Sequence, residues 1–125
     1  MKALSVVTPW GNLIANEDKS LEIRTWKPEQ LPMLNVAIVQ NSQPLSETLQ
    51  EDENAEIVAI VDFVGVKPFV KADCERACEK ESEFEDNWLA WEIANVRKLS
   101  TPIKAVAKRK IYELSDSELK QLDLK

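Results

Sequence analysis

The chain has 125 residues, of which 44% are hydrophobic and 30% are charged, and its formal net charge is −6 at pH 7. This composition is typical of a soluble globular protein, and we expect residues 1–125 to form one domain. The negative charge excludes a protein that coats nucleic acid without specificity, because such proteins carry an excess of Lys and Arg. No apolar run approaches the roughly 20 residues of a membrane helix, so we expect no membrane partner.

The residue types that the sequence lacks restrict its chemistry. There is no histidine, which excludes a histidine general base, a Ser-His-Asp triad and an imidazole-ligated metal. We therefore predict no resident metal or cofactor, although a nuclease would need a divalent metal with oxygen ligands. Cys74 and Cys78 are too few for a disulfide framework and do not form a CxxC pair. The first residues are too weakly apolar for a signal peptide, so a cytoplasmic location is expected.

The N-terminal segment predicts a strand that is followed at once by a helix. Residues 3–7 are apolar enough for a strand that enters the core. Thr8 suits the N-cap of the helix, and Pro9 suits its first position, where no amide donor is needed. We expect the helix over residues 9–17, with Trp10 at the beginning of its apolar face.

Strict alternation of residue types predicts the second strand, over residues 20–26. Successive side chains of a strand point to opposite faces. One face then carries Leu21, Ile23 and Thr25, and the other carries Ser20, Glu22, Arg24 and Trp26. Because Lys19 directly precedes this strand, we expect three charged side chains close to one another.

The rest of the chain predicts further strands and peripheral helices. The expected strands cover residues 34–39, 55–66, 88–94 and 103–114, and the expected helices cover residues 47–51, 71–86 and a terminal segment after the capping box Ser115–Glu118. Asp62 interrupts the most apolar strand, so it needs a partner or a place at the mouth of a pocket. Together the elements predict an α+β fold: a small, mostly antiparallel β-barrel with a helix inserted after the first strand and with peripheral helices.

Charge is unevenly distributed along the sequence. Residues 73–86 are mainly acidic, whereas residues 97–110 carry only basic charges. A basic strand on an acidic domain is compatible with one specific nucleic-acid ligand. The acidic segment, expected to form a surface helix, is a candidate for contact with a protein partner.

The order of the residues resembles the ASCH domain family, which has a PUA-like barrel fold. Four landmarks carry the resemblance: Leu4-Ser5 with Thr8-Pro9-Trp10; Lys19 with Glu22-Ile23-Arg24-Thr25-Trp26; Ile60-Val61-Asp62-Phe63-Val64; and Trp91 with Asn95, Arg97 and Pro102-Ile103. Two features depart from the family pattern. The turn has Thr8 where Gln is common, and residues 37–41 replace a His-Ala-Ser-Lys-like end of the third strand.

This resemblance implies RNA or nucleotide binding in a cleft beside the inserted helix. The implied ligand-binding residues are Thr8, Trp10, Lys19, Glu22, Arg24, Trp26, Asn95 and Arg97. An Arg fork and a Lys charge suit a phosphate or carboxylate, a Glu accepts from the amino group of a base, and a Trp stacks on it.

The same residues also have plainer interpretations. Glu22 and Arg24 are equally typical of a solvent-exposed pair, and Trp10 of a core residue. Asn95 and Arg97 are equally typical of a turn amide and a surface cation. Asp62 fits a paired residue at a bulge.

The resemblance also leaves catalysis open. One branch of the family deacylates acetylated cytidine with a Lys-Thr-Glu set, and other members are metal-dependent ribonucleases. If this protein is an enzyme, Lys19 and Glu22 are its candidate catalytic residues. However, Glu22 stands where the threonine is expected, and a neighbouring carboxylate opposes nucleophilic use of Lys19. The sequence thus favours binding of RNA, a nucleotide or a modified nucleoside, with a hydrolase or a protein-interaction module as alternatives.

Overall fold

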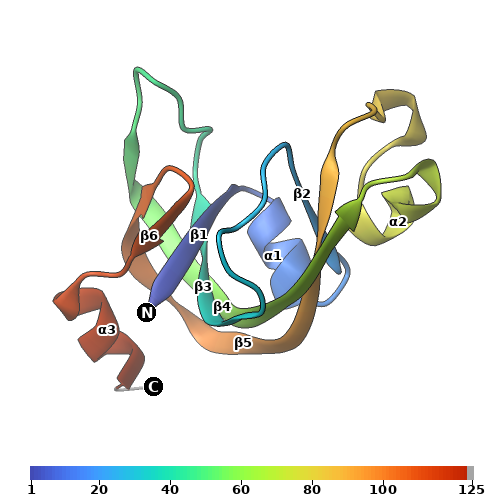
Figure 1. The fold of residues 1–125 in the computed structure, drawn as a ribbon. Helices are drawn as coiled ribbons and strands as arrows, with labels where there is room; N and C mark the ends of the chain where they lie inside the picture. The colour runs from blue at the N-terminus through green and yellow to red at the C-terminus, as the bar shows by residue number, and fades with distance from the viewer. Residues whose placement is uncertain (124–125) are drawn as a thin grey trace.

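A mixed β-sheet of six strands is the frame of the protein, which a computed structural model describes over residues 1–123 (Figure 1). The strands are β1 (Lys2–Val7), β2 (Leu21–Arg24), β3 (Met33–Asn41), β4 (Glu51–Pro68), β5 (Leu89–Lys108) and β6 (Ile111–Glu113). Their order across the sheet is β2-β5-β4-β3-β1-β6. β1 and β3 are parallel, and the other neighbouring pairs are antiparallel.

The α+β class and the helix after the first strand are confirmed, but the closed barrel is wrong. Among residues 1–123, no strand pairing joins the edge strands β2 and β6. The sheet bends instead through the long pair β4–β5, whose register shifts at four places. Bulges of this kind bend a sheet without closing it. Figure 1 shows the two strands curving together beneath α1 (Trp10–Ala15).

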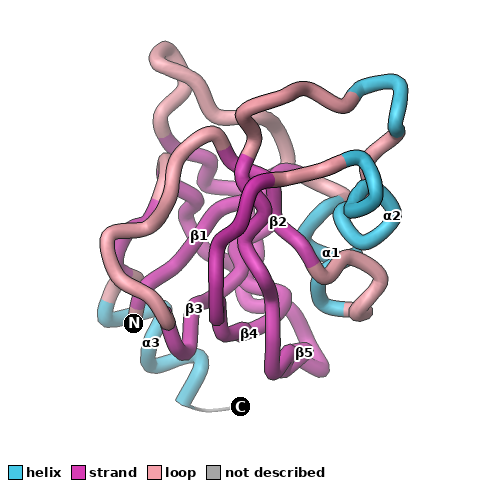
Figure 2. Tube along the Cα trace, turned by 45° about the vertical axis from the view of Figure 1, so that its right-hand side comes forward, coloured by secondary structure: helices cyan, strands magenta, loops and turns pink. Residues whose placement is uncertain are grey.

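In the described residues the other α-helices are α2 (Cys74–Ala77) and α3 (Asp116–Asp123). They lie at opposite ends of the molecule in both views (Figure 1 and Figure 2). The predicted capping box of α3 is confirmed. The Glu118 backbone N–H donates to Ser115 Oγ at 3.2 Å, and Glu118 Oε1 accepts from the Ser115 backbone N–H at 2.8 Å. Within residues 1–123, no helix has the length and apolar character needed to cross a membrane.

The start of α1 differs from the prediction. The helix begins at Trp10 with Pro9 at its N-cap, and no side chain caps it, so the N-cap role of Thr8 is wrong. The Thr8 backbone N–H donates to the Asn41 carbonyl oxygen at 2.9 Å, which prolongs the pairing of β1 with β3. Thr8 is therefore held by the sheet and not by the helix.

Two of the predicted strands form one continuous strand. Residues 88–94 and 103–114 were expected to be separate, but β5 continues through Pro102 because its pairing with β4 continues on both sides of that residue. The short β6 then follows a turn. Pairing with a neighbouring strand thus overrides a local signal for interruption.

Of the predicted helices, the one over residues 47–51 is absent and the one over residues 71–86 is shorter. Residues 46–50 form a loop, in which Ser46 Oγ accepts from the Leu49 backbone N–H at 3.1 Å, and Glu51 already begins β4. The expected helix over residues 71–86 is reduced to α2 and two 3-10 turns, Lys71–Asp73 and Glu81–Glu83. α2 ends at Ala77, and the next residue, Cys78, has a left-handed φ of 58°.

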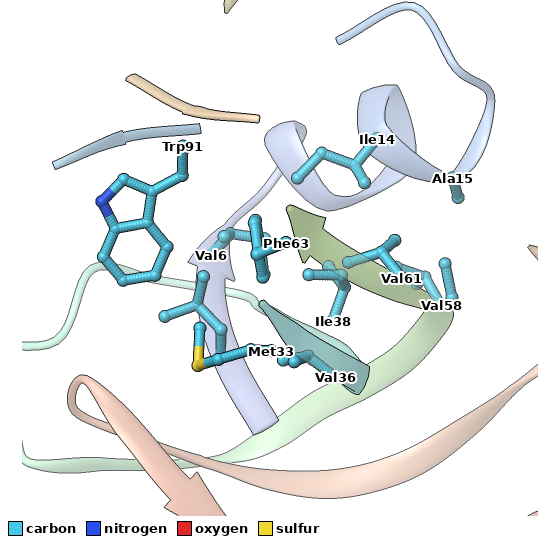
Figure 3. Close-up of a cluster of buried hydrophobic side chains, with 12 residues drawn as sticks. Val6, Ile14, Ala15, Met33, Val36, Ile38, Val58, Val61, Phe63 and Trp91 are labelled. Carbon is cyan, nitrogen blue, oxygen red and sulfur yellow. The ribbon is translucent and has the colours of Figure 1, made fainter. Parts of the chain in front are cut away.

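Trp91 lies at one side of the largest cluster of buried side chains (Figure 3). It is completely buried, and its ring centroid is 5.4 Å from that of Phe63 and 4.9 Å from that of Trp26, in edge-on contacts. Its Nε1 also donates to the Trp26 carbonyl oxygen at 3.0 Å. The buried residue Trp91 thereby fixes the position of the more exposed Trp26. On the other side of the cluster, Ile14 anchors α1 (Figure 3).

Gly11 permits the close approach of α1 to β3. A Cβ added at this position would lie 2.8 Å from Gln40 Cβ, which is nearer than real Cβ atoms come. We expect Gly11→Ala to lower the free energy of unfolding by roughly 1–2 kcal/mol, because overpacking outweighs the gain in helix propensity. Chemical denaturation would measure the change. Asn12→Ala, an exposed change in the same helix, is the control, and equal stability of Gly11→Ala and the wild type would contradict the packing argument.

Candidate functional site

A pocket of about 650 Å³ lies at the junction of several elements. Its walls come from the end of β1, the start of α1, strand β2, the end of β3 and the turn between β5 and β6. This volume is in the range of pockets that hold small organic ligands, which is about 300–1,000 Å³. Five of the predicted ligand-binding residues line the pocket: Trp10, Lys19, Glu22, Arg24 and Trp26.

A buried group of charges forms the polar centre of the pocket. Glu22 is only 6% exposed and lies between two cations, with Oε1 at 3.9 Å from Lys19 Nζ and Oε2 at 3.5 Å from Arg24 Nη2. Glu22 and Arg24 share one face of β2, as the alternating sequence predicts. A carboxylate buried at this depth needs such partners, because its desolvation is costly.

The two cations are fixed by backbone oxygens. Lys19 is 3% exposed, and its Nζ donates to the Ala77 carbonyl oxygen at 2.5 Å. Arg24 Nη2 donates to the Ser5 carbonyl oxygen at 2.8 Å. These bonds tie β2 to α2 on one side and to β1 on the other, so the charged group is part of a rigid frame.

Two buried acceptor atoms of the described residues have no hydrogen-bond partner, Glu22 Oε2 and Asn41 Oδ1. Both residues line this pocket. Sequence reasoning missed Asn41, the last residue of β3. The available signal was a pair of amide side chains, Gln40 and Asn41, at the end of an apolar strand. That signal indicates a site only when the neighbours of the strand are known.

Two tryptophans flank the charged group. Lys19 Nζ lies 5.3 Å from the ring centroid of Trp10, and Lys110 Nζ lies 5.5 Å from that of Trp26. Both are cation–π distances. Trp26 and Lys110 also line a second pocket, of about 680 Å³, which includes Lys2 and Lys27. The two pockets therefore share a wall.

Three predicted site residues lie outside the lining of the main pocket. Thr8 is exposed at the end of β1. Asn95 and Arg97 lie on β5, and both donate hydrogen bonds to Asp62.

Asp62 joins the bulged parts of β3, β4 and β5. It accepts hydrogen bonds from the Asn35 backbone N–H at 2.9 Å, from Asn95 Nδ2 at 2.8 Å and from Arg97 Nη2 at 3.0 Å. Asn35 and Asn95 both have left-handed φ angles, of 56° and 52°. These bonds, above all the one from the Asn35 backbone, lower the pKa of Asp62 below its ordinary value. The interpretation of Asp62 as a paired residue at a bulge is confirmed.

The lowered pKa of Asp62 predicts a stability that depends on pH. Because the pKa is lower in the folded than in the unfolded state, the contribution is complete above about pH 4 and is lost as the pH falls through the folded value. We expect Asp62→Asn to reduce the melting temperature by several degrees at neutral pH, with a difference that shrinks in acid. Thermal unfolding over a pH series would measure it.

The matched control for Asp62→Asn is Asp86→Asn, which makes the same change at an exposed turn residue. It should leave the melting temperature nearly unchanged at every pH. A difference between Asp62→Asn and the wild type that stayed constant from neutral to strongly acidic pH would contradict the role given to the carboxylate.

The acidic segment lies against the pocket. Its Ala77 carbonyl oxygen holds Lys19, its Arg76 carbonyl oxygen accepts from the Ser20 backbone N–H at 2.8 Å, and Glu79 lines the pocket. Both cysteines of this segment are free, and burial raises the pKa of the Cys74 thiol. In the described part of the chain, no group of three or more His, Cys, Asp or Glu side chains is placed to hold a metal ion.

The bent mixed sheet and the pocket beside its inserted helix define a small α+β domain of PUA-like fold. The profile of the ASCH domain matches residues 4–103, and the chain therefore belongs to the ASCH domain family. Domains of this family generally resemble RNA-binding domains. No curated protein matches the chain.

Three crystal structures of ASCH from Zymomonas mobilis share the fold. A Tyr-to-Phe mutant is 11% identical with a TM-score of 0.68, and the alignment covers 98% of this chain and 96% of that one. The protein without mutation is 13% identical with a TM-score of 0.65, over 98% and 93% of the chains. A Ser-to-Ala mutant is 13% identical with a TM-score of 0.62, over 98% and 94%. Identities this low establish the likeness of fold alone.

Proposed function

We propose that this protein binds RNA or a nucleotide in the main pocket, with Lys19, Glu22 and Arg24 at its polar centre. The observation that carries the proposal is the buried carboxylate of Glu22, held between two cations in a pocket that two tryptophans flank. The membership in the ASCH domain family supports it.

Each part of the pocket suits one part of a nucleotide. The faces of Trp10 and Trp26 suit a base, because stacking on an aromatic side chain contributes about 1–3 kcal/mol per base. Arg109 and Lys110 are exposed at the rim, where cations suit a phosphate that remains partly hydrated. The buried charges lie deeper and suit polar atoms of the base or sugar.

The second pocket favours a ligand longer than one nucleotide. It shares Trp26 and Lys110 with the main pocket, and Lys110 lies over the ring of Trp26. The basic residues that line the two pockets outnumber the acidic ones by six to three: Lys2, Lys19, Arg24, Lys27, Arg109 and Lys110, against Glu22, Glu29 and Glu79. A single strand that passes over Trp26 would place neighbouring nucleotides in both pockets.

The position of Lys19 favours recognition over nucleophilic catalysis. Its Nζ donates to a backbone carbonyl oxygen, lies near Glu22 and is almost inaccessible to solvent. A nucleophilic amine must instead present a free lone pair to the substrate. We therefore assign Lys19 and Glu22 to binding.

Titration with mononucleotides and short single-stranded RNAs, at one fixed salt concentration, tests the proposal. We expect Arg24→Ala to weaken binding about tenfold or more, because a hydrogen bond to a charged group contributes about 1.5–3 kcal/mol. Trp26→Ala should weaken binding to a similar extent, because it removes the aromatic ring on which a base would stack. Quenching of tryptophan fluorescence or calorimetry would measure the affinities.

Lys104→Ala is the matched control, because it also removes one positive charge, from an exposed position on β5 that lines neither pocket. It should change the affinity little. Thermal unfolding of each variant would separate loss of binding from loss of structure. The proposal fails if no nucleotide or RNA binds, or if Arg24→Ala and Trp26→Ala bind as the wild type does.

A further inference from the structure

The two unpaired acceptors of the pocket limit what a ligand must offer. Glu22 and Asn41 are only 6% and 4% exposed, yet Glu22 Oε2 and Asn41 Oδ1 have no hydrogen-bond partner among the described residues. An unpaired buried acceptor costs about 1–3 kcal/mol, and most such atoms in folded proteins are paired. Their presence in one pocket indicates that a ligand completes them.

No neighbouring donor of the protein makes a hydrogen bond to Glu22 Oε2. Glu22 Oε1 accepts from the Ile23 backbone N–H at 3.0 Å. Arg24 Nη2 is 3.5 Å from Glu22 Oε2 but directs its hydrogen bond to the Ser5 carbonyl oxygen at 2.8 Å. The second oxygen of Glu22 therefore stays available to the pocket.

A phosphate does not fit these two atoms, because its oxygens only accept. The group that faces them must carry N–H or O–H donors, and in a nucleotide the exocyclic amino group of a base supplies two N–H donors from one atom. A carboxylate that accepts from the amino group of cytosine is a known pairing in nucleic-acid recognition. Uracil has one ring N–H between two carbonyl oxygens, and these oxygens would face the carboxylate unfavourably.

We infer that the main pocket selects a base with a free exocyclic amino group and discriminates against uracil, with Glu22 as the principal acceptor and Asn41 as the second. This inference rests on the proposed function and makes it more specific. Discrimination arises from repulsion as well as attraction, because a carbonyl oxygen placed beside Glu22 Oε2 leaves two acceptors in contact.

Paired ligands that differ at the amino group test the inference. Cytidine is compared with uridine, and adenosine with purine riboside, which lacks only the amino group. Short oligocytidylate and oligouridylate provide the same comparison when a longer ligand is needed for binding. We expect the amino-bearing member of each pair to bind about tenfold more tightly to the wild-type protein.

Variants assign the selectivity to particular residues. Glu22→Gln replaces a carboxylate, which only accepts, by an amide that can also donate. The ratio of the affinity for cytidine to that for uridine should therefore fall to near one, or the preference should reverse. Asn41→Ala should reduce the preference without reversing it. Glu56→Gln makes the same chemical change as Glu22→Gln at an exposed position on β4 and should leave the preference unchanged.

The outcomes separate this inference from the proposed function. Equal affinity within both pairs would overturn the inference while nucleotide binding stood. Absence of binding to every nucleoside and oligonucleotide would overturn both. The comparison within the wild-type protein requires no variant, so a folding defect of Glu22→Gln would not prevent the test.

Discussion

The bend of the β4–β5 pair decides where the other elements of this protein can pack. Both strands are long, and their register shifts several times along the bend. Asp62 stabilises the bend because it accepts hydrogen bonds from Asn35, Asn95 and Arg97, two of which have left-handed backbones. β2 pairs with one end of β5, and this register places Glu22 opposite Trp91. The position of the pocket is thus a consequence of the curvature of the sheet.

The charged centre of the pocket is an arrangement that hydrophobic packing alone would not produce. A buried carboxylate between two cations is weak evidence for stability, since apolar residues of equal volume often serve as well. Here one carboxylate oxygen is left without a hydrogen bond, which is a cost to the folded state. Native proteins retain such local costs chiefly at functional sites. The backbone carbonyls of Ser5 and Ala77 hold the cations in place before a ligand arrives, which reduces the ordering cost of binding.

Local patterns were predictable from the sequence, and long-range pairings were not. The shared face of Glu22 and Arg24 follows from the two-residue period of a strand, and the Ser115–Glu118 capping box follows from spacing within one helical turn. The bonding of Arg97 to Asp62 depends on the register between two strands and on bulges that the sequence does not specify. Asn41 was missed for the same reason, because its side chain gains significance only through the pocket that it lines together with β2. The closed barrel was wrong because strand count and alternation do not determine whether two edge strands meet.

The protein is acidic and its proposed ligand is a polyanion, so the distribution of charge over the protein must explain how the two could bind. The net charge is −6, yet basic residues predominate in the lining of the two pockets that share Trp26. Net negative charge elsewhere repels nucleic acid at long range and so weakens indiscriminate binding, whereas the local cations act at the short distances where screening by salt is incomplete. Glu22 adds a negative charge at the deepest point, where it opposes a phosphate and favours a donor. On this argument the carboxylate would lower the affinity for the phosphate backbone and supply the proposed selectivity for the base. The pocket would then favour base selection over tight nonspecific binding.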